Sequence, residues 1–206
     1  MKNNPDSKPP IFFSGVHGGG KSTLIRRLLD SSKKFMKNDF DIDFTVDFPS
    51  IASLTSFERS LIRLYHRFFI ANYAHILSQN NPGKFILTDR TIYDSEAYIN
   101  VYQELGWITK EQFAKLDFLI KNFTMRPYAV VLNPSLEMIK DRLNKRKSEA
   151  TRIMRDKIFV HEDSDEFLEL LSNYFKKFKN EARVLYLETD GETEVQKIIS
   201  WAENLK

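Results

Sequence analysis

Cysteine is absent from the 206 residues of this chain. Its absence excludes disulfide bonds, thiolate nucleophiles and zinc sites built on cysteine, and without a sign of an oxidising compartment we expect a cytoplasmic protein. No apolar run approaches the roughly 20 residues of a membrane-spanning helix, so we expect no membrane partner. Charge of one sign is not in large excess either, since 31 Lys and Arg residues stand against 28 Asp and Glu. The net charge of +3 does not indicate a nucleic-acid partner, so any anion site must be local.

Residues 1–10 are polar and contain two adjacent prolines. This order of residues is unlike a secretion signal or a transit peptide, and we predict a short disordered lead-in. The rest of the chain, residues 11–206, is long enough for one domain, and 42% hydrophobic residues suffice for one substantial core.

Short apolar runs alternate with helical patterns along the domain. The apolar runs predict buried strands at 11–14, 43–46, 84–88, 128–132 and 184–187. Helical spacing of apolar residues predicts helices at 22–29, 55–79, 93–105 and 110–122, another from about residue 135, and a last one after residue 191. Two helices begin at capping boxes, Thr55 with Glu58 and Thr109 with Gln112. This alternation predicts a three-layer α/β/α fold with a five-stranded parallel sheet and with ligands at the carboxyl ends of the strands.

A glycine-rich segment follows the first predicted strand and reads Gly-Val-His-Gly-Gly-Gly-Lys-Ser over residues 15–22. Such a P-loop lets backbone N–H groups converge on phosphate oxygens at the positive end of the next helix. The segment predicts a P-loop NTPase fold with ATP and Mg²⁺ as cofactors. Lys21 would neutralise the β and γ phosphates, and Ser22 would offer a hydroxyl to Mg²⁺. The residues expected to bind the nucleotide are Gly15, Gly18, Gly19, Gly20, Lys21, Ser22 and Thr23.

Asp89 ends the third predicted strand, where a nucleotide kinase needs a carboxylate near magnesium. It is the second candidate metal ligand, and the alternative is a helix cap. Residues 87–98 read LTDRTIYDSEAY and resemble the Asp-Arg-aromatic-x-x-Ser-x-x-Ala-Tyr segment of thymidylate kinases, with Thr91 in place of the aromatic residue. The segment is also similar to the Glu-Arg-Ser segment of deoxynucleoside kinases. Both families have the P-loop fold expected above.

The resemblance covers most of the chain in order and implies transfer of the γ-phosphoryl group of ATP to a nucleoside monophosphate. Arg67 and Arg90 would then bind the acceptor phosphate, because guanidinium matches phosphate in bidentate geometry. Asp47, after the second predicted strand, could orient or deprotonate an acceptor hydroxyl. Phe48 and Tyr98 could stack on a base, and packing in the core is the alternative for these aromatic side chains.

The stretch 142–157 is the most basic part of the chain, with Arg142, Lys145, Arg146, Lys147, Arg152, Arg155 and Lys157. In the kinases that this chain resembles, such a segment closes over ATP and brings guanidinium groups to the transferring phosphoryl. We therefore predict a helical lid in which Arg142 and Arg146, one helical turn apart, stabilise the transition state. The alternatives are a solvated helix face and a nucleic-acid patch, although no aromatic residues are interleaved with these basic residues.

The identity of the acceptor stays open at this point. Thymidylate kinases usually carry an acidic residue in the P-loop that helps to hold the acceptor, whereas this sequence has His17, to which we assign no role. A nucleoside kinase is the second hypothesis and would need a base such as Asp47. A nucleotide-binding regulatory ATPase without a small-molecule acceptor is the third. The sequence does not define the oligomeric state, and a homodimer is compatible with it.

Overall fold

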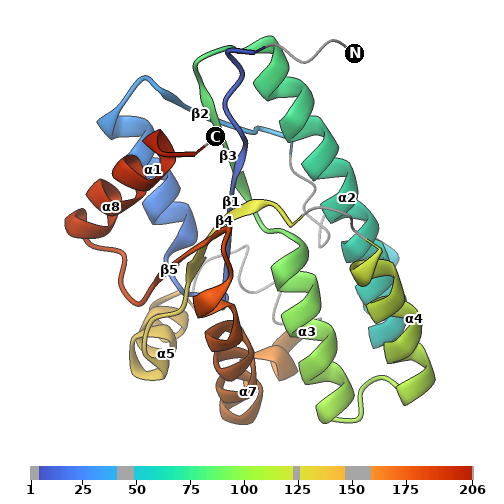
Figure 1. Cartoon of the computed structure of the whole chain (residues 1–206). Coiled ribbons are helices and arrows are strands. Elements are labelled where there is room, and N and C mark those ends of the chain that lie inside the picture. Colours follow the sequence, from blue (N-terminus) through green and yellow to red (C-terminus); the bar gives the residue numbers. More distant parts are fainter. Residues whose placement is uncertain (1–4, 41–48, 123–125, 147–158, 206) are drawn as a thin grey trace.

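The computed structural model describes residues 5–40, 49–122, 126–146 and 159–205. Its centre is a five-stranded sheet in the order β2-β3-β1-β4-β5, and every adjacent pair is parallel. The strands are β1 (Ile11–Gly15), β2 (Phe35–Lys37), β3 (Phe85–Asp89), β4 (Tyr128–Leu132) and β5 (Val184–Leu187). Helices cover both faces of this sheet (Figure 1), so the three-layer α/β/α fold predicted from the sequence is confirmed.

Side chains of the central strand alternate between two cores, because successive residues of a strand point to opposite faces of the sheet. Ile11 and Phe13 pack on the face covered by α1 (Lys21–Ser31) and α8 (Glu192–Glu203). Phe12 packs on the opposite face. That face is covered by α2 (Ser56–Asn80), α3 (Ile92–Glu104), α4 (Lys110–Lys121), α5 (Leu136–Lys145) and α7 (Asp165–Lys176). The short 3-10 helices are η1 (Pro49–Ser53), η2 (Val160–Asp163) and η3 (Lys177–Asn180).

Both predicted capping boxes are present. The Thr55 hydroxyl accepts a hydrogen bond from the Glu58 amide at 3.2 Å, and the Glu58 carboxylate accepts one from the Thr55 amide at 2.8 Å. Thr109 and Gln112 make the same reciprocal contacts at the start of α4. These pairs satisfy N–H groups that have no acceptor within their own helix.

Three features of the described fold were not predicted from the sequence: strand β2, helix α7 and the contacts of the lead-in. The strand expected at 43–46 lies outside the described residues, and β2 is instead a three-residue strand in which only Phe35 is fully buried. Helix α7 was not predicted, although its apolar residues recur at helical intervals. In the lead-in, Asp6 and Lys8 accept hydrogen bonds through their carbonyls from the Gly83 amide and the Ser78 hydroxyl.

The strand register brings the predicted functional segments to one edge of the sheet. Gly15 at the end of β1 is level with Leu132 of β4, and Phe13 is level with Asp89 of β3. The P-loop and the turn after Asp89 therefore lie side by side at the carboxyl ends of neighbouring strands. Among the described helices, none is long and apolar enough to cross a membrane.

Candidate active site

The P-loop connects β1 to α1 and takes a backbone path that only glycine follows without strain. Gly18 and Gly20 have positive φ angles of 77° and 104°. A Cβ atom at Gly20 would also lie 2.3 Å from the Asp190 carboxylate. Helix α1 begins after this loop with no acidic residue in its first turn. Its first N–H groups and the positive end of its dipole therefore favour an anion such as phosphate.

Lys21 is buried directly under the loop, with 5% of its surface exposed. Its Nζ donates hydrogen bonds to the carbonyls of Gly15 and Val16 at 2.9 and 3.0 Å. Burial, together with the nearby Arg90 guanidinium, lowers the pKa of Lys21 to about 7. Negative phosphate oxygens near Nζ would favour the charged ammonium and raise this pKa again.

Asp94 is the carboxylate with which several of these groups interact. It accepts hydrogen bonds from the Ser14 hydroxyl at 2.7 Å and from the Thr91 amide at 3.0 Å. Its other oxygen accepts from Arg90 Nη1 at 2.7 Å. Burial alone would raise the pKa of Asp94, but the neighbouring cations, Arg90 first among them, hold it below its usual range. Asp94 is therefore ionised at neutral pH.

Arg90 is the non-glycine residue with a positive φ angle, 70°, among the described residues. Its amide donates to the Phe13 carbonyl at 2.8 Å, and its Nη1 donates to the Gly15 carbonyl at 3.0 Å. A left-handed residue with a Cβ costs roughly 1–3 kcal/mol and persists only where surrounding contacts fix it. Such strain is typical of functional sites, so the positive φ angle of Arg90 is a reason to examine this turn as part of the site.

Asp89 and Ser22 are the two residues predicted from the sequence to hold magnesium. Asp89 ends β3 beside the P-loop strand, and its buried Oδ1 has no hydrogen-bond partner among the described residues. Ser22 lies exposed in the first turn of α1. The described residues contain no group of three or more acidic, His or Cys side chains that could hold a metal. Mg²⁺ commonly binds through one or two carboxylates plus substrate phosphates, so this donor set fits it.

Arg67 on α2 faces the same group of charges. Its pKa is lowered to about 10, first by burial and then by the Arg90 guanidinium, although Asp94 and Asp89 act against these effects. Its Nε is buried without a hydrogen-bond partner among the residues that the structure describes. A buried guanidinium with spare donors is a candidate site for an anionic ligand.

Tyr98 supports the site from α3. Its hydroxyl lies 2.9 Å from His17 Nδ1, and its ring lies 5.9 Å from the guanidinium carbons of both Arg63 and Arg90. Edge contacts with Tyr102 and Phe167 enclose the same ring. Packing in the core, the alternative considered for Tyr98, therefore describes its surroundings better than an open face for a base.

Arg142 and Arg146 differ in their surroundings. Arg142 donates to the Gly19 carbonyl at 2.8 Å and pairs with Asp190 at 2.8 Å. Its guanidinium thus braces the P-loop in this state. Arg146 follows the last residue of α5 and is exposed.

Asp47, Phe48 and the lid residues 147–157 lie outside the described residues. Three aspartates were not predicted as site residues. Asp94 accepts a hydrogen bond from the Gly15 amide, Asp163 pairs with His17, and Asp190 pairs with Arg142. For Asp94 there was a signal, since it occupies the serine position of the thymidylate kinase pattern. Asp163 and Asp190 carry no comparable motif.

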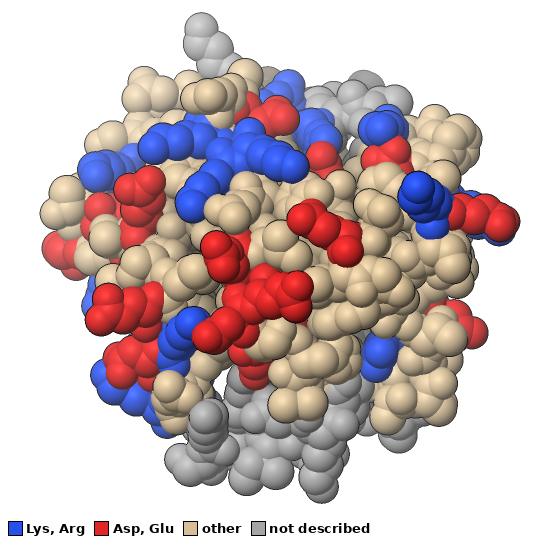
Figure 2. Space-filling view, turned by 90° about the horizontal axis from the view of Figure 1, so that it is seen from below, with Lys and Arg blue, Asp and Glu red and all other residues tan. Residues whose placement is uncertain are grey.

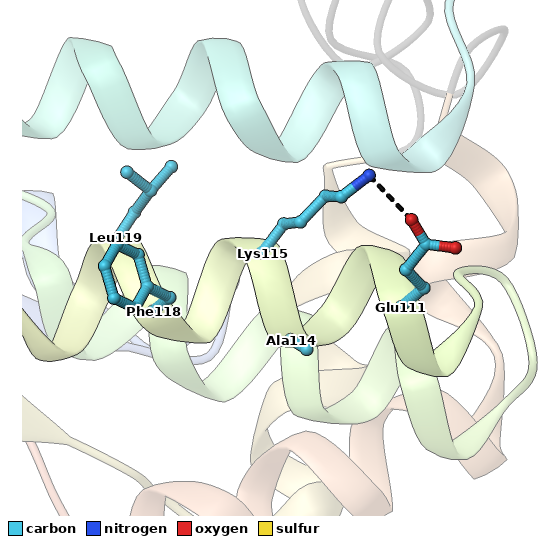
Figure 3. Close-up of a pocket in the computed structure, with 5 residues that line it drawn as sticks. All are labelled: Glu111, Ala114, Lys115, Phe118 and Leu119. Carbon is cyan, nitrogen blue, oxygen red and sulfur yellow. Dashed lines mark ion pairs between the residues drawn. The ribbon is translucent and has the colours of Figure 1, made fainter.

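The surface shows two further features. Figure 2 shows a face on which basic side chains gather near one margin and acidic side chains lie across the middle, so it presents no continuous basic surface among its described residues. A shallow hollow on α4 is lined by Glu111, Ala114, Lys115, Phe118 and Leu119 (Figure 3). None of these five residues belongs to the P-loop or to the turn after β3.

No protein-family model and no curated protein sequence matches this chain. Solved structures do match it over nearly the full length. Thymidylate kinase from Candida albicans has a TM-score of 0.71 and 19% identity, and the match covers 96% of this chain and 93% of that one. The chain therefore has the fold of the P-loop nucleotide kinases.

Deoxyadenosine kinase from M. mycoides is also similar to this protein. With the product dCMP bound, it has a TM-score of 0.69 at 15% identity, and the match covers 95% of this chain and all of that one. With dATP bound, the same enzyme has a TM-score of 0.66 at 14% identity and the same coverage. The resemblance to both kinase groups stated from residues 87–98 is confirmed at the level of fold.

Proposed function

We propose that this protein transfers the γ-phosphoryl group of ATP to a nucleoside monophosphate. The nucleotide would bind at the P-loop, with Lys21 and the N–H groups at the start of α1 facing its phosphates. Ser22 and Asp89 would hold Mg²⁺, which supplies charge neutralisation at the phosphates when bound. Arg67 and Arg90, on α2 and on the turn after β3, would bind the acceptor phosphate.

The observation that carries this proposal is the buried, partnerless Nε of Arg67 next to two other cations. Lys21, Arg67 and Arg90 are opposed in this region by the carboxylates Asp89 and Asp94. The pKa values of Lys21 and Arg67 are lowered first by burial and then by the nearby Arg90 guanidinium. An acceptor phosphate would bring negative charge as well as hydrogen-bond acceptors to Arg67, whereas a nucleoside offers hydrogen-bond acceptors without the charge.

Catalysis in this proposal depends on positioning and on charge. An acceptor phosphate is already ionised at neutral pH, so its attack needs no general base. Two guanidinium groups would fix its orientation relative to the donor phosphates and so contribute to near-attack geometry. Asp47, Phe48 and the lid arginines keep the acceptor and transition-state roles predicted from the sequence, and Tyr98 would act by supporting Arg90.

A nucleoside acceptor is the second candidate. It is favoured by the similarity to a deoxyadenosine kinase whose whole chain is covered. In that case a hydroxyl attacks, and Asp47 would be the residue to remove its proton.

The test is a coupled ADP-release assay of the purified protein with Mg-ATP across nucleosides and nucleoside monophosphates. We expect turnover with at least one monophosphate. Arg67→Met should lower kcat/KM for that acceptor by roughly 10²-fold, since hydrogen bonds to charged groups are worth about 1.5–3 kcal/mol each. The KM for ATP should change little.

Arg26→Met is the matched control, because Arg26 is an exposed arginine on α1. Its kinetic constants should equal those of the wild type. Turnover with nucleosides alone would replace the proposal by a nucleoside kinase. ATP hydrolysis without transfer to any acceptor would refute both kinase hypotheses and favour a regulatory ATPase.

A further inference from the structure

Asp94 has more hydrogen bonds than a helix cap requires. Its carboxylate is 3% exposed, and it accepts from the Thr91 amide as the third residue of α3 normally would. It also accepts from the Ser14 hydroxyl at 2.7 Å, from the Gly15 amide at 3.4 Å and from Arg90 Nη1 at 2.7 Å. One carboxylate thus joins the end of β1, the first P-loop residue and the turn after β3.

The Gly15 carbonyl contacts one residue from the proposed ATP side of the site and one from the proposed side of the phosphate acceptor. Its carbonyl accepts from Lys21 Nζ at 2.9 Å and from Arg90 Nη1 at 3.0 Å. Lys21 belongs to the proposed ATP side, and Arg90 belongs to the proposed acceptor side. If Lys21 turns toward phosphate oxygens, Arg90 keeps two acceptors in place, the Gly15 carbonyl and Asp94 Oδ1.

We propose that Asp94 is a positioning residue that fixes the Arg90 guanidinium relative to the P-loop, so that the acceptor phosphate is held at a set distance from the donor phosphates. This inference rests on the proposed function. Asp94 touches neither substrate and acts through Arg90 and Gly15. The two carboxylate oxygens have different partners. Oδ2 accepts hydrogen bonds from Ser14 and Thr91, and Oδ1 accepts them from Arg90 and the Gly15 amide.

Glu96 provides a matched control on the same helix. It also pairs with an arginine, Arg126, at 2.5 Å. The Arg126 guanidinium lies 5.1 Å from the Tyr93 ring, and neither Glu96 nor Arg126 contacts the P-loop in the described structure. Glu96→Gln therefore removes a comparable carboxylate charge without touching Gly15 or Arg90.

The experiment compares Asp94→Asn, Arg90→Met, the double variant and Glu96→Gln with the wild type. Asp94→Asn should lower kcat/KM for the acceptor by roughly 10- to 10²-fold. ATP affinity, measured by calorimetry, should fall less than threefold. The double variant should be no worse than Arg90→Met alone, because interactions that act through one residue are not additive. Glu96→Gln should stay within twofold of the wild type.

Two results would overturn the inference. One is multiplication of the Asp94→Asn and Arg90→Met effects in the double variant, which would mean that Asp94 acts independently of Arg90. The other is an equal loss of activity in Glu96→Gln, which would reduce Asp94 to an ordinary structural carboxylate. Thermal unfolding of each variant checks that the protein remains folded.

Ser14→Ala keeps the inference testable if Asp94→Asn does not fold. It removes only the hydroxyl that donates to Asp94 Oδ2, and it should lower acceptor turnover by roughly three- to tenfold, again without adding to Arg90→Met. A purely additive Ser14→Ala effect would contradict the role of Asp94.

A crystal structure of Asp94→Asn, or of Ser14→Ala if the first variant does not fold, gives a readout that needs no activity. In Asp94→Asn the Arg90 guanidinium should leave the Gly15 carbonyl, and in Ser14→Ala the Asp94 carboxylate should turn and Arg90 should shift with it. An unmoved Arg90 would overturn the inference. A wild type that transfers phosphate to no acceptor would instead refute the proposed function, and this structural comparison would still decide whether Asp94 positions Arg90.

Discussion

His17 Nε2 lies 2.7 Å from Asp163 Oδ1, which connects the middle of the P-loop to η2, far along the chain. A carboxylate only accepts hydrogen bonds, so Nε2 carries the hydrogen and donates it to Asp163. The other ring nitrogen, Nδ1, lies 2.9 Å from the Tyr98 hydroxyl on α3. One side chain of the P-loop thus joins the loop to η2 and to α3.

Replacing this histidine should destabilise the protein. His17 is 7% exposed, and His17→Ala removes its contacts with Asp163 and Tyr98. We expect the free energy of unfolding to fall by about 1.5–3 kcal/mol, the range for hydrogen bonds to charged groups. Urea denaturation measures this change. Tyr98→Phe removes only one of the two contacts and should cost about 1 kcal/mol, and a His17→Ala variant as stable as the wild type would refute the bracing role.

Lys21→Met should abolish phosphoryl transfer but stabilise the nucleotide-free protein. The pKa of Lys21 is about 7 in the folded protein, against 10.5 for an ordinary lysine side chain. Between these values the unfolded state holds a proton that the folded state has lost, so the stability of the wild type rises with pH from about 7 to 10.5. Below about pH 7 the full cost of burying the ammonium is present.

Chemical denaturation at several pH values between 6.5 and 9.5 measures this difference. The advantage of Lys21→Met over the wild type should be largest near pH 6.5 and shrink as the pH rises, by at most about 1.4 kcal/mol per pH unit. The Gly15 and Val16 carbonyls keep other donors, Arg90 and the Gly19 amide, so the variant leaves neither without a partner. A difference that does not vary with pH would contradict the lowered pKa.

Asp89→Asn should lower magnesium-dependent turnover by roughly 10²-fold or more, as expected for loss of a charge-stabilising group. The physical reason is that Asp89 ends β3 beside the P-loop strand, and its Oδ1 has no hydrogen-bond partner among the described residues. Its charge would therefore act on Mg²⁺ at the phosphates, directly or through water. Steady-state rates over a range of MgCl₂ concentrations measure the effect. Asp117→Asn, which removes the carboxylate that pairs with Lys121 on α4, is the control and should leave turnover unchanged. An unchanged magnesium dependence in Asp89→Asn would mean that Asp89 does not act at the metal site; it would not make Asp89 a helix cap either, because Thr91 caps α3.

Arg142→Ala and Arg146→Ala should have different effects. Arg142 contacts the Gly19 carbonyl and Asp190, so its removal should weaken ATP affinity as well as lower kcat. Arg146 is exposed at the end of α5, so its removal should leave ATP affinity unchanged and lower kcat if it acts in the transition state. Binding of a fluorescent ATP analogue and single-turnover rates separate the two quantities. Identical effects of both variants would contradict the bracing role of Arg142.

Much of the architecture follows from local sequence. The strands β1, β4 and β5 and the starts of α2 and α4 lie where the apolar runs and capping boxes predicted them. The P-loop was recognised because its chemistry depends on neighbours in the chain, namely a strand, glycines with positive φ angles, a lysine and a helix start. Asp89-Arg90 was recognised for the same reason, since a motif of adjacent residues carries it.

Strand β2 shows where local sequence stops being informative. It has three residues, and only Phe35 is fully buried, so neither alternation nor an apolar run marks it. Its position is decided by parallel pairing with β3, from Phe35 opposite Phe85 to Lys37 opposite Leu87. That pairing joins residues about fifty positions apart, which no local pattern encodes.

The charged contacts of the site were decided by tertiary structure alone. The sequence assigned Arg67 and Arg90 to the acceptor phosphate and Arg142 to the lid, but it could not tell their partners apart. In the folded protein Arg90 pairs with Asp94 and Arg142 pairs with Asp190, while Arg67 Nε has no partner among the described residues. The sequence likewise gave His17 no role until the fold brought Asp163 to it. The physical reason is that a hydrogen bond requires two atoms within about 3 Å, and long-range packing sets which polar atoms meet that condition in a buried site.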